Sequence, residues 1–248
     1  MKIIVFILGL IMGSFLNVCI YRIPKGESIV YPPSHCGSCN NLIKPYDLIP
    51  VISYIFLQGK CRYCQSKISI KYPIIEISTG LLFLVIYNFY GVSFYFVKNI
   101  TLICFILSIA IIDLDTTNVY SKTTIPFAVL AIIFILIEKF YLKHNISIYI
   151  YGALLSLIVM GSIIFITNSM GTGDLDICLI VGLFLGVKLT AITLMLSFIF
   201  GGVMGIILIL LKKKDKKDYM PFVPYIAMAS IFSIFFGEKI FLWYITLF

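Results

Sequence analysis

Two aspartates, Asp113 and Asp174, lie at the edges of apolar stretches in a chain that is 61% hydrophobic and only 12% charged. A carboxylate at the mouth of a membrane helix is costly to bury, so such an acid usually belongs to a functional site. Two carboxylates held close together cannot both ionise cheaply, and they therefore share a proton. One of them can then draw a proton from water while the other donates a proton to a carbonyl oxygen.

Each of these aspartates has a second aspartate two residues further on, Asp115 and Asp176. Residues two apart lie about 200° apart around a helix and cannot face the same partner. Each pair therefore offers one candidate, and spacing alone leaves open which member it is. The second pair follows the run Gly171-Thr-Gly-Asp174, for which the simpler alternative is the first turn of a helix with Asp174 as its N-cap.

Four cysteines form two C-x-x-C pairs, Cys36 with Cys39 and Cys61 with Cys64, and 21 residues separate the pairs. Four thiolates at this spacing are typical of a zinc ribbon, in which the metal replaces the core that so short a segment cannot build. Two disulfides are the alternative, but they require an oxidising compartment. His35 could substitute as a ligand, although a loop histidine at this place is more often solvated.

The elements that must position these groups are membrane helices, because a mean hydropathy of +1.08 over 248 residues is too high for one soluble core. The chain is predicted to be an all-α polytopic membrane protein with about eight transmembrane helices and a small zinc-ribbon-like insertion. The first helix is expected to be retained, since no small-residue cleavage site follows it. Apolar windows of about 17 to 23 residues place the helices near residues 3–20, 74–90, 97–113, 124–141, 147–166, 175–188, 190–211 and 222–247.

The distribution of positive charge predicts the orientation, because lysine and arginine accumulate in cytoplasmic loops. Thirteen of the 19 lysines and arginines fall on one side, in residues 21–73, 114–123 and 212–221, and six fall on the other. The cysteine pairs are therefore expected in the reducing cytoplasm, which favours zinc over disulfides. Both Asp113 and Asp174 are expected at the same, cytoplasmic membrane face. The net charge of +8 fits this topology and anionic lipid, and nucleic acid is not expected as a partner.

These residues resemble the bacterial type IV prepilin peptidases. The segment from Asp113 to Pro126 is similar to the family's first catalytic segment, and Gly171-Thr-Gly-Asp174 to its G-x-G-D segment. The resemblance covers nearly the whole chain. Three further pieces fall in the family's order: Gly13-Ser-Phe-Leu-Asn-Val18 with Arg22 and Pro24, the two C-x-x-C pairs, and Tyr72-Pro-Ile-Ile-Glu76 followed by Gly80. The chain departs from the pattern at Tyr120, where a proline is usual, and at Asp176, where a lysine is usual.

The resemblance implies a membrane aspartic endopeptidase of the bacterial inner membrane with Asp113 and Asp174 as its catalytic residues. Its substrates would be prepilins or pilin-like precursors, cut after a short leader at the cytoplasmic face. The resemblance also implies N-methylation of the new amino terminus with S-adenosylmethionine, for which Glu76 is the candidate residue. Glu76 lies near the start of a helix, so a purely structural answer to the helix dipole is an equal alternative.

The expected organisation is a first helix in residues 1–20, a cytoplasmic four-cysteine domain in 21–73 that is also the expected methyltransferase region, and a peptidase domain in 74–248. Two other functions remain open from the residues. An ion-coupled transporter would place acids near the bilayer midplane and show internal repeats, and neither feature is visible. A zinc-ribbon assembly factor without catalysis would tolerate the loss of both aspartates. The sequence does not indicate an oligomeric state.

Overall fold

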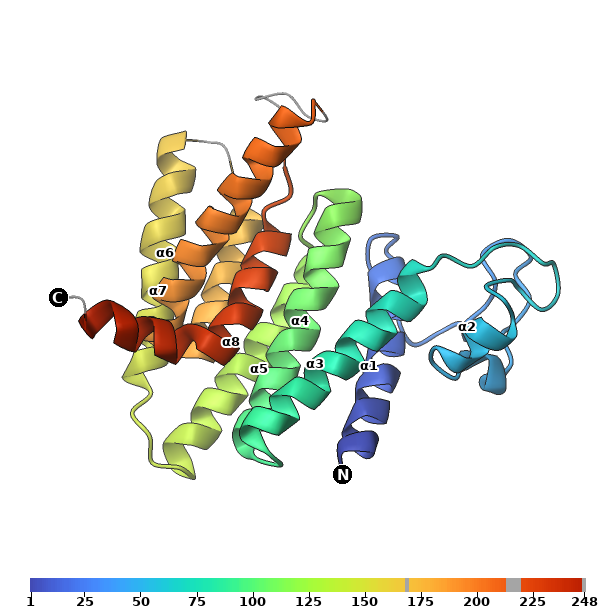
Figure 1. Cartoon of the computed structure of the whole chain (residues 1–248), viewed down its shortest axis with the longest axis horizontal. Helices are drawn as coiled ribbons and strands as arrows, with labels where there is room; N and C mark the ends of the chain where they lie inside the picture. Colours follow the sequence, from blue (N-terminus) through green and yellow to red (C-terminus); the bar gives the residue numbers. More distant parts are fainter. Residues whose placement is uncertain (168–169, 213–219, 247–248) are drawn as a thin grey trace. The chain divides into compact units, whose positions relative to one another are not determined.

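The computed structural model describes residues 1–167, 170–212 and 220–246. Its elements are α-helices with one short 3-10 helix, η1, and within these described residues no strand is present (Figure 1). The elements are α1 (Lys2–Arg22), η1 (Pro45–Leu48), α2 (Ile52–Phe56), α3 (Lys71–Tyr90), α4 (Phe94–Thr116), α5 (Ser121–Phe140), α6 (Ser147–Thr167), α7 (Thr172–Leu210) and α8 (Val223–Thr246). The all-helical prediction is confirmed.

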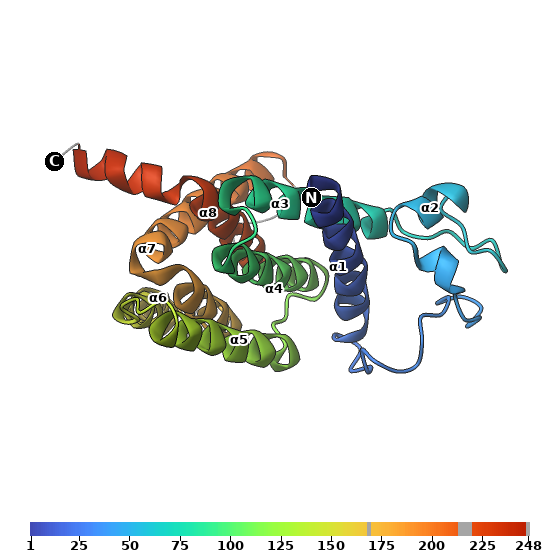
Figure 2. The same ribbon diagram turned by 90° about the horizontal axis from the view of Figure 1, so that it is seen from below.

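The chain divides into two compact units, Met1–Cys104 and Phe105–Phe248, with the boundary inside α4. In the first unit α1 and α3 pack along each other, and small residues allow their backbones to approach closely. A Cβ added at Gly9 would lie 2.7 Å from the Cα of Gly80. The segment between these two helices, which carries η1 and α2, extends to one side of the pair (Figure 2).

In the second unit α7 packs against α5, α6 and α8. The crossing of α6 and α7 is close because glycines face each other: a Cβ at Gly182 would lie 2.7 Å from the backbone of Gly152. The Ser156 hydroxyl donates to the carbonyl oxygen of Cys178 over 2.9 Å, which joins the same two helices. This packing fixes the first turn of α7, where Asp174 lies.

Seven helices of the described chain are long and apolar enough to cross a membrane, by length and composition. The count is seven because α7 covers both of the expected segments 175–188 and 190–211, which the prediction had counted as two helices. The backbone of α7 is broken at Gly186, where φ is +75° and ψ is 169°. Two helical arms, residues 172–185 and 187–210, therefore meet at this glycine, two residues before the boundary placed at Lys188. The lysines of the expected loop 212–221 lie, except for Lys212, outside the described residues.

Candidate functional site

The two candidate aspartates are buried in the second unit. Asp113 lies in the last turn of α4 and is 2% exposed, and Asp174 is the third residue of α7 and is 3% exposed. The two carboxyl groups are close enough to interact electrostatically. The neighbouring aspartates Asp115 and Asp176 are both exposed. Burial thus distinguishes Asp113 and Asp174 from their neighbours in the two alternating pairs, a difference that the spacing alone did not predict.

The loop after α4 contacts the first turn of α7, and this contact brings the two aspartates together. A Cβ added at Gly173 would lie only 2.6 Å from the Cβ of Val119, so only glycine allows this approach. The N-cap of α7 is Gly171, with φ of −75° and ψ of 149°. Asp174 is thus inside the first turn and is not the N-cap, and a carboxylate there is favoured by the helix dipole.

A third element, α8, also reaches Asp113. The backbone N–H of Val223, the first residue of α8, donates to Oδ2 of Asp113 over 3.2 Å. The hydrogen bond joins residues 110 positions apart in the chain. Nothing in the pattern of residues 220–225 marks this contact, and sequence reasoning missed it. One carboxylate oxygen of Asp113 is thus held by a backbone hydrogen bond from α8. The position of Asp113 relative to Asp174 therefore depends on three helices, α4, α7 and α8.

The four cysteines of the first unit gather into one cluster. The sulfur atoms of Cys36, Cys39, Cys61 and Cys64 all lie within 4.8 Å of one another, and no disulfide joins them. The Sγ atoms of Cys36 and Cys64 are 3.8 Å apart. Four sulfurs at Zn–S distances of about 2.3 Å form a tetrahedron with edges of about 3.8 Å, so this donor set fits a zinc ion. The Nδ1 atom of His35 is instead 3.1 Å from the carbonyl oxygen of Pro33.

Both cysteine pairs adopt the same local fold. The N–H of Cys36 donates to the carbonyl oxygen of Asn41 over 2.9 Å, and the N–H of Cys61 donates to that of Ser66 over the same distance. An isolated β-bridge closes each turn, one between His35 and Leu42 and one between Lys60 and Lys67. In each turn the fourth residue after the first cysteine has a positive φ, 56° at Asn40 and 58° at Gln65. Each C-x-x-C pair is therefore shaped by its own backbone.

The thiols have unequal acidity. The backbone N–H groups of Cys39 and Ser38 lower the pKa of the Cys36 thiol to about 6. The Ser66 hydroxyl and its backbone likewise lower the pKa of Cys64. At Cys39 the hydrogen bond from the Asn41 backbone also lowers the pKa. Burial and hydrogen bonding with Cys64 and Cys36 outweigh it and raise the pKa of Cys39 to about 11. Because a metal binds the thiolate, the lowered pKa values of Cys36 and Cys64 favour metal binding.

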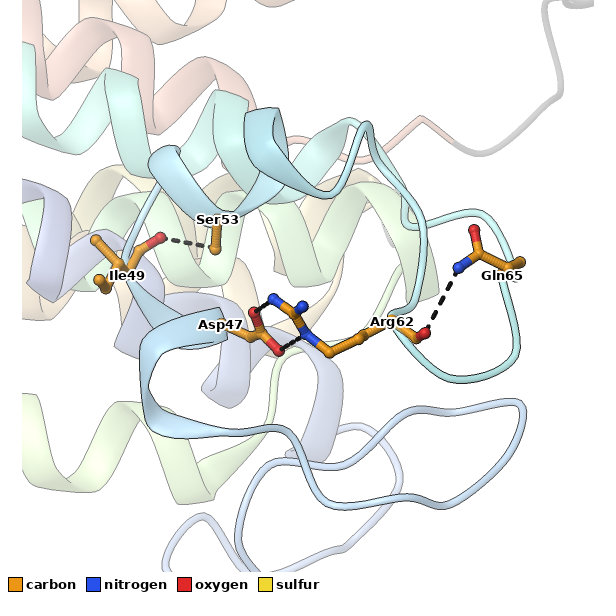
Figure 3. Close-up of polar contacts among 5 residues, drawn as sticks. All are labelled: Asp47, Ile49, Ser53, Arg62 and Gln65. Atoms are coloured by element: carbon orange, nitrogen blue, oxygen red, sulfur yellow. Dashed lines mark hydrogen bonds and ion pairs between the residues drawn. The ribbon is translucent and has the colours of Figure 1, made fainter.

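An ion pair ties η1 to the second cysteine turn (Figure 3). Arg62 donates from Nε to Oδ2 of Asp47 over 2.8 Å and from a terminal nitrogen to Oδ1 over 2.6 Å. The guanidinium lowers the pKa of the Asp47 carboxyl. In the same view the Ser53 hydroxyl donates to the carbonyl oxygen of Ile49, and the Gln65 amide to that of Arg62. Sequence reasoning missed this pair, although the opposite charges flanking the cysteines were a possible signal.

A cavity of about 330 Å³ opens in the first unit between the end of α1, the cysteine segment and the start of α3. Its lining includes polar and aromatic side chains, among them Ser14, Asn17, Arg22, Tyr54, Tyr72 and Glu76. Several of them hold backbone nearby: the Asn17 amide donates to the carbonyl oxygen of Tyr72 over 3.1 Å, and Arg22 to that of Ser28 over 2.9 Å. The cavity is of the size that small ligands occupy.

Glu76 lies on α3 at the wall of this cavity and is 7% exposed. Its Oε2 accepts the backbone N–H of Val51 over 2.7 Å. The carboxylate therefore contacts the cysteine segment, which neither the helix-dipole alternative nor the methyl-transfer prediction required.

Comparison with known proteins agrees with this arrangement. The family description "Bacterial Peptidase A24 N-terminal domain" matches residues 7–90, and "Type IV leader peptidase family" matches residues 100–206. The chain is 31% identical to a prepilin leader peptidase/N-methyltransferase of Bacillus subtilis, over 98% of each chain. The chain belongs to the type IV leader peptidase family.

Two further leader peptidase relatives with the same name support this membership. The protein of Neisseria gonorrhoeae is 31% identical over 82% of this chain and 80% of its own length. That of Aeromonas hydrophila is 30% identical over 99% of this chain and 94% of its own. No solved structure matches the chain. The two matched family regions carry the cysteine cluster and the aspartate pair, respectively.

Proposed function

We propose that this protein is a multi-pass aspartic endopeptidase of the bacterial inner membrane that removes the short leader of type IV prepilins or pilin-like proteins. The observation that carries the proposal is the buried, interacting pair Asp113 and Asp174 in a member of the leader peptidase family. The names of the relatives supply the substrate class. A pair of buried acids in a membrane protein requires a compensating function, since burial alone is costly.

In the proposed reaction the two carboxyl groups share one proton. The ionised carboxylate takes a proton from a water molecule while the water oxygen attacks the scissile carbonyl carbon. The protonated carboxyl group donates its proton to the carbonyl oxygen. Collapse of the tetrahedral intermediate breaks the C–N bond, and the amine leaves with a proton from the pair. In this proposal the hydrogen bond from the Val223 N–H to Asp113 and the Val119–Gly173 contact hold the two side chains toward the same substrate bond.

A second proposed activity is N-methylation of the new amino terminus, with S-adenosylmethionine as the methyl donor. The names of the relatives include this activity. The cavity beside the cysteine cluster is the candidate site, because it combines a ligand-sized volume with polar groups such as Asn17 and Arg22. Zinc held by Cys36, Cys39, Cys61 and Cys64 would fix the wall of this cavity, and the metal is proposed as structural.

The proposed orientation places the aspartates and the cysteine segment on the cytoplasmic side, following the excess of lysine and arginine in the loops. The division into a first helix in residues 1–20, a four-cysteine domain in 21–73 and a peptidase domain in 74–248 stays a prediction. The two compact units, Met1–Cys104 and Phe105–Phe248, describe the packing of the chain. Neither the transporter nor the non-catalytic assembly factor is favoured by the family membership.

The test replaces each aspartate by asparagine in the full-length protein and follows cleavage of a pilin-like precursor in proteoliposomes. Asp113→Asn and Asp174→Asn should each lower the rate by about a thousandfold or more, as expected when one member of a catalytic pair is lost. The exposed neighbours provide matched controls: Asp115→Asn and Asp176→Asn should stay within about threefold of wild type. Unchanged cleavage in the Asp113 and Asp174 variants would refute the proposal.

A further inference from the structure

The backbone at Val51 has an unusual conformation. Its φ is +63° and its ψ is −50°, and the N–H of Ile52 donates to the carbonyl oxygen of Pro50 over 2.6 Å. These values define a γ-turn of the rare positive-φ form, which is strained. The conformation is especially unfavourable for a β-branched residue, because its Cβ substituents crowd the neighbouring carbonyl groups. Such a turn persists only where surrounding contacts hold it in place.

One contact that holds this turn comes from α3. The N–H of Val51 donates to the buried Oε2 of Glu76 over 2.7 Å, a short hydrogen bond. Glu76 is itself held by α1: Gly13 approaches so closely that a Cβ there would lie 2.7 Å from the Cα of Glu76, and Ser14 hydrogen-bonds its carboxyl group. The acceptor is thus held by contacts within the α1–α3 pair that do not involve the loop.

The γ-turn at Val51 positions one wall of the cavity. α2 starts directly after Val51, and Ser53, Tyr54 and Leu57 all line the cavity. The Tyr54 hydroxyl donates to the carbonyl oxygen of Ile68 over 3.4 Å, and the Tyr54 ring lies against Gly59. α2 is therefore joined to both ends of the second cysteine turn.

We infer that Glu76 is a positioning residue that holds the Val51 turn, and through it α2 and the second cysteine turn, against the α1–α3 pair. Its carboxylate acts as a hydrogen-bond acceptor and is not the base of the methyl transfer. In its activity readout the inference rests on the proposed methyl transfer, whereas its structural readout is independent of that activity.

The test uses four variants of the full-length protein: Glu76→Gln, Glu76→Ala, Val51→Gly, and Glu76→Ala combined with Val51→Gly. Gln retains an oxygen that can accept the Val51 N–H, and Ala does not. Glycine adopts a positive φ without the steric cost. In Val51→Gly the turn therefore depends less on the hydrogen bond to Glu76. The primary readout is amide hydrogen exchange across residues 50–57, and the second is the KM for S-adenosylmethionine measured separately from kcat.

Glu76→Ala should speed exchange across residues 50–57 by about tenfold or more, as expected when a backbone N–H loses a buried acceptor, and should raise KM more than it lowers kcat. Glu76→Gln should stay within about threefold of wild type in both readouts, because a neutral acceptor keeps most of the bond. In the Glu76→Ala background, Val51→Gly should reverse most of the rise in the KM for S-adenosylmethionine.

Wild-type exchange in Glu76→Ala would overturn the inference. So would a Glu76→Gln variant that loses kcat as completely as Glu76→Ala and is not rescued by Val51→Gly, because Glu76 would then act in the chemistry. A wild-type protein that cleaves precursor but never methylates it would refute the second proposed activity alone. The exchange rates would still decide whether Glu76 holds the turn.

Discussion

The cysteine segment and the aspartate pair are built in opposite ways. Each C-x-x-C turn is shaped by hydrogen bonds between residues five positions apart, such as that from Cys36 to Asn41. The aspartate pair instead depends on contacts between distant parts of the chain, such as that from Val223 to Asp113. A locally built site can be recognised from residue spacing alone. The geometry of a site built by helix packing can be predicted only if the packing of the helices is known. The two sites should therefore respond differently to mutation.

The largest expected effect is at the cysteine cluster, where one metal joins two separately formed turns. Replacing Cys61 and Cys64 together by serine should abolish zinc binding, because structural zinc sites contribute on the order of 10 kcal/mol. Metal analysis of the purified protein should find about one zinc per chain in the wild type and none in the variant. Precursor cleavage should fall by no more than about tenfold, since the cysteine cluster and the aspartate pair belong to separate compact units and sites without shared partners are usually independent.

A wild-type protein that contains no zinc although its thiols are intact would contradict the prediction that the four cysteines bind this metal. A variant that lost all cleavage while retaining its helical content would show that the two sites are coupled.

The next effect concerns the contact between the two aspartate segments. Gly173→Ala places a Cβ within 2.6 Å of that of Val119, so the loop and helix must separate. Overpacking of this kind costs about 1–3 kcal/mol, and a displacement of about 1 Å can lower a rate about a hundredfold. Cleavage kinetics in proteoliposomes would measure the loss.

Val119→Ala does not remove the closest atom, its Cβ, whereas Val119→Gly does. Combined with Gly173→Ala, Val119→Gly should recover part of the activity, and Val119→Ala should recover less. Equal rates for Gly173→Ala and wild type would show that this approach does not set the geometry of the pair.

A smaller effect is expected where α1 meets α3. A Cβ at Gly13 would lie 2.7 Å from the Cα of Glu76, which is backbone and cannot move aside. Gly13→Ala should therefore destabilise the first unit by about 1–3 kcal/mol. Thermal unfolding in detergent checks the stability, and Gly161→Ala, at a glycine with nothing within 4 Å of the added Cβ, is the matched control. Equal destabilisation by both substitutions would contradict the close packing.

The smallest effect is expected at Asp47. Arg62 lowers the pKa of this carboxyl in the folded protein, so the ion pair contributes stability above the unfolded pKa of about 3.9. This contribution is lost as the pH falls through the lower, folded pKa. Asp47→Asn should speed amide exchange of η1 by no more than about fivefold at pH 7, because partly exposed ion pairs are weak. The difference from wild type should vanish in strong acid, and a difference that grew there would exclude the ion pair as its cause.

The residues that sequence reasoning could assign are those with a local signature. Hydropathy predicted the membrane helices, and spacing predicted the cluster of four cysteines that the structure contains. The break in α7 was expected at Lys188 because a charge is visible in a hydropathy profile, whereas the actual break at Gly186 depends on a positive φ. The choice of Asp113 over Asp115 needed burial, which depends on how α4 packs. The contacts of Val119, Val223 and Val51 carry no local signal at all.

The break at Gly186 has a consequence for how water reaches the aspartates. The first arm of α7, residues 172–185, extends only about 20 Å at 1.5 Å per residue, whereas the hydrocarbon layer is about 30 Å thick. An arm of this length that runs across the membrane leaves at least one of its ends below the headgroups. Where that end carries Asp174, the hydrolytic water and the scissile bond of the substrate must enter the bilayer along polar protein groups to reach it. The rate of such an enzyme would then depend on membrane thickness as well as on substrate sequence.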